Sequence, residues 1–83
     1  MSSYGYLLEG DCVPVFAAAG RERRKLLGWF DELAAHPFLP ADYEENTPSG
    51  RHVHVVLREQ WLITYWPDHA IKRMWIVEIV RVT

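Results

Sequence analysis

Residues 49–66 constrain the fold of this chain more than any other stretch. The run SGRHVHVVLREQWLITYW alternates bulky apolar side chains with others, as half-buried strands do. Only Glu59 and Gln60 separate its two halves, which predicts a hairpin with a two-residue turn that pairs Arg58 with Trp61. Turns of this length usually contain Asn-Gly or Asp-Gly, so the pairing register could also be shifted by one residue. Such a shift would exchange the two faces of the hairpin.

The two faces of this predicted hairpin differ in polarity. We expect the more uniformly apolar face to lie under helices; it collects Val53, Val55, Leu57, Leu62, Thr64 and Trp66. The opposite face is amphipathic, and we expect it to stay open and to carry the function. That face collects His52, His54, Val56, Arg58, Trp61, Ile63 and Tyr65.

The rest of the chain predicts two helices and two more strands. Leu26, Phe30 and Leu33 follow the spacing of one helix face, and this helix ends at Pro37 because the residue before a proline avoids helical angles. We expect a strand over residues 4–9, helices over 12–19 and 21–35, a loop over 38–50 and a last strand over 72–82. This order predicts an α+β fold, β-α-α-β-β-β. Its last three strands form an antiparallel meander, its first strand joins the sheet's edge or pairs with the last, and both helices cover one face.

Length and composition indicate one folded domain over residues 1–83. A hydrophobic share of 49% and an aromatic share of 13% argue against disorder and suggest apolar surface that a partner covers. The single cysteine, Cys12, excludes an internal disulfide. The sequence shows neither a signal peptide nor an apolar run near the ~20 residues of a membrane span, so we expect a cytoplasmic protein with no membrane partner.

Two histidines in the first strand of the hairpin are candidates for chemistry. His52 and His54 alternate and therefore point to the same side, where they could transfer protons near neutral pH or bind a metal ion. A third metal ligand would have to come from His36, His69 or Cys12, and none stands at a characteristic spacing. We therefore expect histidines that face solvent, without a metal or another cofactor.

Basic residues gather on and beside the meander. They could bind a phosphate and stabilise charge in a phosphoryl-transfer reaction. An equally good explanation is that charges at strand ends keep the sheet from pairing with other chains. These residues are Arg51, Arg58, Lys72, Arg73 and Arg81.

Aromatic residues in the same strands also allow two interpretations. Trp61, Tyr65, Trp66 and Trp75 could stack on nucleic-acid bases. Aromatic residues in strands more often fill a core or a protein interface, and for those on the open face we favour an interface.

Several segments together resemble the RelE/ParE superfamily, the toxins of bacterial type II toxin–antitoxin systems. They are LAAHP in the second helix, DYEE in the loop, SGR before the hairpin, WLITYW, and the closing IVEIVRV. The resemblance implies a small toxin that a cognate antitoxin neutralises by wrapping around it. In the RelE branch it implies cleavage of mRNA in the ribosomal A site, by basic residues and an acid/base that promote attack by the 2′-hydroxyl. In the ParE branch it implies action on DNA gyrase without a nuclease site.

The resemblance carries over to only some residues. Arg51 and Arg81 match the family's basic residues most nearly. The family usually has an arginine in a G-x-R position that opens the third strand, and this chain has Glu-Gln-Trp-Leu over residues 59–62. Its net charge of −2 also differs from the strongly basic character of ribosome-directed toxins.

Two hypotheses follow. In the first, the chain is a ribosome-dependent endoribonuclease in which arginines bind phosphate and a histidine substitutes for the family's acid/base. The catalytic residues are then Arg51, Arg73 and Arg81 together with His52 or His54. In the second, the chain is a non-catalytic ParE-like toxin or a protein-binding module that acts through exposed aromatic residues, for which the sequence suggests Trp61 and Tyr65.

Overall fold

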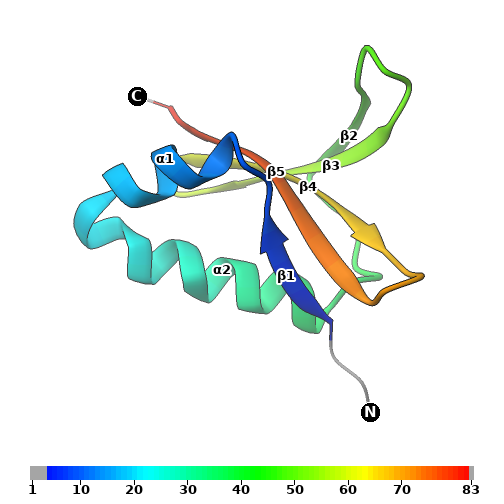
Figure 1. The fold of residues 1–83 in the computed structure, drawn as a ribbon, viewed down its shortest axis with the longest axis horizontal. Helices are drawn as coiled ribbons and strands as arrows, with labels where there is room; N and C mark the ends of the chain where they lie inside the picture. The colour runs from blue at the N-terminus through cyan, green and yellow to red at the C-terminus, as the bar shows by residue number, and fades with distance from the viewer. Residues whose placement is uncertain (1–3, 83) are drawn as a thin grey trace.

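The computed structural model describes residues 4–82 and forms a five-stranded mixed sheet with two α-helices on one face. Figure 1 shows α1 and α2 side by side as one layer, with the β2–β3 hairpin projecting at the opposite side of the sheet. The predicted α+β fold is confirmed. Its elements are β1 (Gly5–Leu8), α1 (Cys12–Ala18), a 3-10 turn (Gly20–Glu22), α2 (Arg23–Ala35), β2 (Tyr43–Asn46), β3 (His52–Arg58), β4 (Trp61–Asp68) and β5 (Arg73–Arg81).

The strands lie in the order β1-β5-β4-β3-β2. Strands β3, β4 and β5 pair antiparallel, so the predicted meander is confirmed. Strand β1 pairs parallel with β5, with Gly5 opposite Arg73, which is one of the two placements that the sequence allows. Parallel neighbours need a crossover connection, and the helices that follow β1 carry the chain across one face of the sheet.

Strand β2 lies within residues 38–50, which the sequence predicts to be a loop. All four of its residues are exposed, and the sequence YEEN has no apolar alternation to mark it. Backbone pairing with β3 forms this strand. The turn between them is closed by the Thr47 N–H, which donates to the Arg51 carbonyl at 2.8 Å, and by Gly50 with φ +88°.

The two helices separate at Gly20, as the sequence predicts. Gly20 has a φ of +62°, an angle that favours glycine, and it begins the 3-10 turn. Helix α2 therefore begins at Arg23 and not at Arg21. Of residues 4–82, no helical segment has the length and apolar character that a bilayer crossing requires.

The predicted hairpin register is confirmed, but the predicted assignment of its faces is wrong. Arg58 lies opposite Trp61, so Glu59 and Gln60 form the turn. The helices cover the face that was expected to be open; its buried hairpin residues are Val56, Trp61, Ile63 and Tyr65. They pack with helix residues, Met74, Ile76 and Ile79 in one core. We call this side the covered face and the other side the open face.

The reversal has a physical cause in how polar side chains escape the core. Strand β3 lies next to the edge strand, so Arg58 and His54 reach the rim of the covered face, where Arg58 Nη1 lies 3.6 Å from Asp42 Oδ2. The Trp61 indole N–H donates to Glu22 Oε2 at 2.7 Å. These partners let the covered face accept polar groups. The bulkier Trp61, Ile63 and Tyr65 then fill the core.

Candidate functional site

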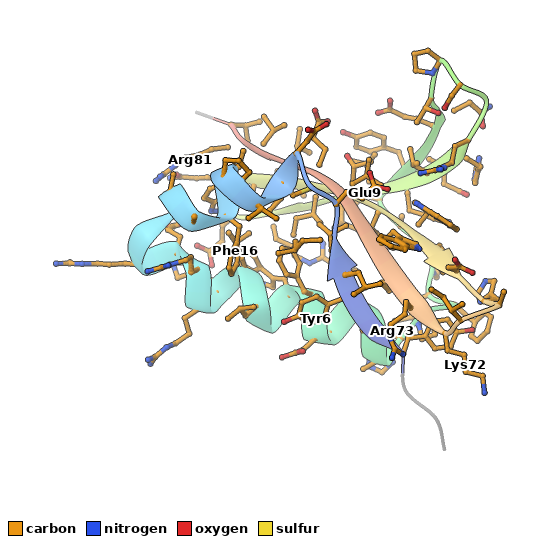
Figure 2. The ribbon with its side chains drawn as sticks, viewed as in Figure 1. Tyr6, Glu9, Phe16, Lys72, Arg73 and Arg81 are labelled. Carbon is orange, nitrogen blue, oxygen red and sulfur yellow. The ribbon has the colours of Figure 1, made fainter. Side chains whose placement is uncertain are left out.

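The five residues that the sequence singled out lie in four separate places. Arg51 belongs to the open face. His52 and His54 lie at the rim of the covered face, since consecutive residues of a strand point to opposite sides. Arg73 and Arg81 stand at opposite ends of β5, as Figure 2 shows. A nine-residue strand is roughly 26 Å long, so no single small ligand bridges these two arginines.

On the open face, Arg51 anchors a cluster with Trp66, Trp75 and Glu9, which we call the open-face cluster. The Arg51 guanidinium carbon lies 4.8 Å from the centre of the Trp66 ring, as in a cation–π contact. The Trp66 and Trp75 rings stack with centroids 6.4 Å apart and planes 19° apart. Arg51 Nη1 also lies 3.4 Å from Glu9 Oε1, so the side chain spans the face towards the residue that follows β1.

The open-face cluster can offer a cation and a stacking surface together. The Arg51 side chain is 47% exposed, and its planar guanidinium has donors free for a second carboxylate or a phosphate. The Trp75 indole N–H donates to Asp68 Oδ2 at 3.3 Å, which fixes the orientation of that ring. Glu9 competes with any anionic ligand for Arg51.

The surface beside this cluster is acidic. Between the β2–β3 turn and the start of α1, a groove of about 540 Å³ runs over the open face. Its carboxylates come from Glu9, Asp11, Glu45 and Glu78. Such a groove attracts cationic side chains and repels a nucleic-acid backbone.

Glu44, His52 and His54 form a second cluster at the rim of the covered face, which we call the histidine cluster. Glu44 in β2 lies opposite His54, and its Oε1 is 3.6 Å from His54 Nδ1 and in hydrogen-bonding contact with His52 Nε2. The His54 ring stacks on Tyr65 with centroids 5.4 Å apart. Burial lowers the pKa of His54, against the opposing effect of the Glu44 carboxylate, and the hydrogen bond from His52 lowers the pKa of Glu44.

These environments define what the histidines can do. A lowered pKa keeps His54 neutral at neutral pH, the form in which an imidazole accepts a proton. The β3 backbone, however, separates His52 and His54 from Arg51, because the side chains alternate. The structure therefore brings the two histidines together and leaves the arginine on the other side of the strand.

Arg81 and Arg73 make mainly structural contacts. The Arg81 guanidinium donates to Gln60 Oε1 at 3.2 and 3.4 Å and lies 5.6 Å from the centre of the Trp61 ring. The Arg73 side chain lies along Gly5, where an added Cβ would approach its Cδ to 3.2 Å. Gly5 thus gives Arg73 space in the parallel pairing of β1 with β5.

Sequence reasoning missed the acidic partners of both clusters. Glu44 pairs with the histidines through β2, a strand that no periodicity marks, and Glu9 reaches Arg51 from the far side of the sheet. The separations along the chain are 42 residues for the Glu9–Arg51 contact and 8 for the Glu44–His52 contact. Of the two contacts, only Glu44–His52 joins residues that are close in the sequence, where two acidic residues shortly precede the two histidines.

The architecture defines a class: a small α+β domain with a mixed sheet, two helices on one face and the other face open. No protein-family model matches the chain, and no curated protein matches its sequence. Solved structures do match. The isolated E. coli RelE toxin aligns with a TM-score of 0.78 at 11% identity, over 98% of this chain and 86% of that chain.

Two complexes give the same result. A chain of the archaeal RelE–RelB complex from Pyrococcus horikoshii aligns with a TM-score of 0.75 at 13% identity, over 96% of each chain. The toxin–antitoxin complex RelBE2 from Mycobacterium tuberculosis aligns with a TM-score of 0.70 at 10% identity, over 96% of this chain and 99% of that chain. The fold is therefore that of the RelE toxins, as the sequence resemblance implied.

Proposed function

We propose that this chain is the toxin of a toxin–antitoxin module and that it inhibits translation by cleaving mRNA on the ribosome. The proposal is supported by the RelE-like fold, which extends over 96–98% of the chain. The observation that carries it is the open-face cluster, where a half-exposed arginine lies on a pair of stacked tryptophans.

This arrangement suits single-stranded RNA. An indole can stack on an unpaired base, and a guanidinium can bind the adjoining phosphate and stabilise charge as the 2′-hydroxyl attacks. We assign phosphate binding to Arg51. Proton transfer falls to His52 or His54, which an RNA chain would meet only by passing over the edge of the sheet at the start of β3.

We further propose that a cognate antitoxin covers the open face. Two of the similar structures are toxin–antitoxin complexes. The acidic groove beside the open-face cluster is complementary to a basic antitoxin segment, and a partner seated there would cover the Trp66–Trp75 stack.

The test is tightly controlled induction in a bacterial host, with methionine and thymidine incorporation followed in parallel. We expect protein synthesis to collapse first, and we expect Arg51→Ala to abolish the collapse. Arg24→Ala, on the exposed side of α2, is the matched control and should act like wild type. If Arg51→Ala, at equal abundance, stops translation as fast as wild type, the assignment of Arg51 is wrong.

A second candidate function has its own supporting observation. Four carboxylates line the open-face groove, and the histidines lie on the other side of β3, which favours a protein target over RNA. We therefore keep as the alternative a non-catalytic ParE-like toxin that acts on DNA gyrase, or a protein-binding module. Early loss of thymidine incorporation would support gyrase. The aromatic residues to mutate are Trp66 and Trp75, because Trp61 and Tyr65, which the sequence suggested, are buried.

A further inference from the structure

The histidine cluster has the composition and geometry of a metal site. Glu44, His52 and His54 each offer one ligand atom, and these atoms all lie within 4.8 Å of one another. His52 and His54 stand two residues apart in β3, and Glu44 lies opposite His54 in β2, so strand pairing alone directs them to one place. A tetrahedral zinc ion with bonds of ~2.0–2.2 Å separates its ligand atoms by roughly 3.3–3.6 Å, and His54 Nδ1 lies 3.6 Å from Glu44 Oε1.

The side-chain amide of Asn46 prepares His52 as a ligand. Its Oδ1 lies 3.2 Å from His52 Nδ1 and, as an acceptor, requires the hydrogen on that nitrogen. The other ring nitrogen, Nε2, faces Glu44 Oε1: a hydrogen on Nε2 makes the hydrogen bond described above, and without that hydrogen its lone pair points at the carboxylate. Two lone pairs that point at each other need a proton or a cation between them. Metal-bound histidines have this arrangement, with the second ring nitrogen donating to a fixed oxygen.

His54 presents a nitrogen that lacks a partner. Its Nδ1 atom is shielded from solvent, and within residues 4–82 no group forms a hydrogen bond with it. Stacking on Tyr65 holds the ring in place, so Nδ1 stays directed at the Glu44 side of the cluster. A buried nitrogen without a partner is costly, and a bound cation would remove that cost.

We propose that Glu44, His52 and His54 bind one divalent transition-metal ion of the Zn²⁺ class, with a fourth position open to water. Two imidazoles and a carboxylate select borderline ions such as Zn²⁺ or Co²⁺ over Mg²⁺ and Ca²⁺, which prefer oxygen ligands. The side chains of His52 and Glu44 are 56% and 52% exposed, so they can adjust by rotation and leave room for a water molecule. From the sequence we expected no metal. The third ligand, Glu44, lies in β2, a strand that the sequence does not reveal.

Binding would join β2 to β3. All four residues of β2 are exposed, and the strand is held to its neighbour through the backbone. A metal ion bound to Glu44 and both histidines would add a link between the two strands and raise the thermal midpoint. This inference does not rest on the roles proposed for Arg51 and the tryptophans, which lie on the opposite face. It competes with the proton transfer proposed for His52 or His54, because a metal-bound imidazole nitrogen has no lone pair left to accept a proton.

The experiment is titration of the whole chain with Zn²⁺ by calorimetry, together with the visible spectrum of the Co²⁺ form. We expect one ion per chain and a higher thermal midpoint with Zn²⁺ than with Mg²⁺. Glu44→Gln, His52→Gln and His54→Ala should each weaken binding by more than about 100-fold. Asn46→Ala, which removes a positioning residue, should weaken it by about 10–100-fold with the stoichiometry unchanged.

Matched controls make the result decisive. Glu45→Gln is the same chemical change one residue along β2, on the opposite face, and His69→Asn removes a histidine that bonds with Tyr4 instead; both should bind like wild type. If His54→Ala fails to fold, the Glu44 and His52 variants still test the proposal, because these side chains are more than half exposed and their replacement should leave the fold intact. Equal binding by Glu44→Gln and Glu45→Gln, or no Zn²⁺ binding by folded wild type, would overturn the proposal. Arg51→Ala should bind Zn²⁺ normally even where it abolishes toxicity.

Discussion

The covered and open faces of one sheet both carry bulky side chains but use them differently. On the covered face, Ile63 and Phe30 are fully buried and the tryptophan there, Trp61, bonds to a helix carboxylate. On the open face, Trp66 and Trp75 stay partly exposed and stack on each other, with Arg51 over the Trp66 ring. Packing against the helices stabilises the covered face. The open face buries Val53 and Val55 but leaves Leu57 and Val80 exposed, and this is surface that a ligand or partner can bury.

The largest expected difference between the faces is in the stability lost when a large side chain is truncated to alanine. Ile63→Ala removes a side chain with no exposure and should lower the free energy of unfolding by about 2–5 kcal/mol. Leu57 lies on the open face, two positions before the turn, and is 47% exposed. Leu57→Ala should therefore lower the free energy of unfolding by less than about 1 kcal/mol. Urea denaturation measures both. Comparable losses would contradict the assignment of the two faces.

The two tryptophans Trp61 and Trp66 give the next contrast. Glu22→Ala leaves the buried Trp61 N–H without its acceptor and should cost about 1–3 kcal/mol. Glu22→Gln keeps an oxygen acceptor and should recover most of that loss. The Trp66 N–H has no acceptor among residues 4–82, so Trp66→Phe should cost less than Glu22→Ala. A larger loss for Trp66→Phe in urea denaturation would reverse this comparison.

A smaller effect comes from the thiol of Cys12, which is buried against the covered face and donates to the Ile76 carbonyl at 3.1 Å. Burial, with the Glu9 carboxylate nearby, raises the pKa of Cys12 from 9.0 to about 11. Above the unfolded-state pKa the unfolded chain loses this proton while the folded chain keeps it, so stability falls as pH rises. From about pH 8 to about pH 10, wild type should lose about 1 kcal/mol relative to Cys12→Ala.

The measurement is urea denaturation of wild type and Cys12→Ala at each pH, since other groups titrate equally in both. A second readout is thiol labelling, which should be slow in the folded chain and fast after unfolding. A constant stability difference between the two proteins over this pH range would show that the Cys12 thiol is not sheltered by the covered face.

The smallest effect concerns the turn that sets which side chains share a face. Glu59 has a φ of +53°, a conformation that costs a residue with a side chain and suits glycine. Glu59→Gly relieves this backbone cost and should raise the free energy of unfolding by no more than about 1 kcal/mol. The exposed Lys25–Glu59 ion pair that it removes contributes little. Thermal unfolding checks this, with Lys25→Ala as the control for the lost pair. A clear destabilisation would mean that the ion pair outweighs the backbone.

Several features of the fold could be predicted because local chemistry determines them. Period-two alternation and the single break at Glu59-Gln60 gave the hairpin and its register, and Gly20 and Pro37 bounded the helices. The candidate site was only partly predictable. Alternation along the strand already places Arg51 on the opposite side from His52 and His54, but which of the two sides is covered depends on where the helices pack.

The sequence by itself determined the order of the two helices and of every strand except β2, together with the hairpin pairing, because these depend on short-range geometry. Only the tertiary structure decided which face the helices cover, since both faces are apolar enough to be buried. It also decided that Ile76 and Ile79 are both buried, through a shift in the β4–β5 register at Thr64 and Tyr65. The tertiary structure also made Glu44 and Glu9 partners of the candidate residues, because contacts between separate segments produce no periodic pattern in the sequence.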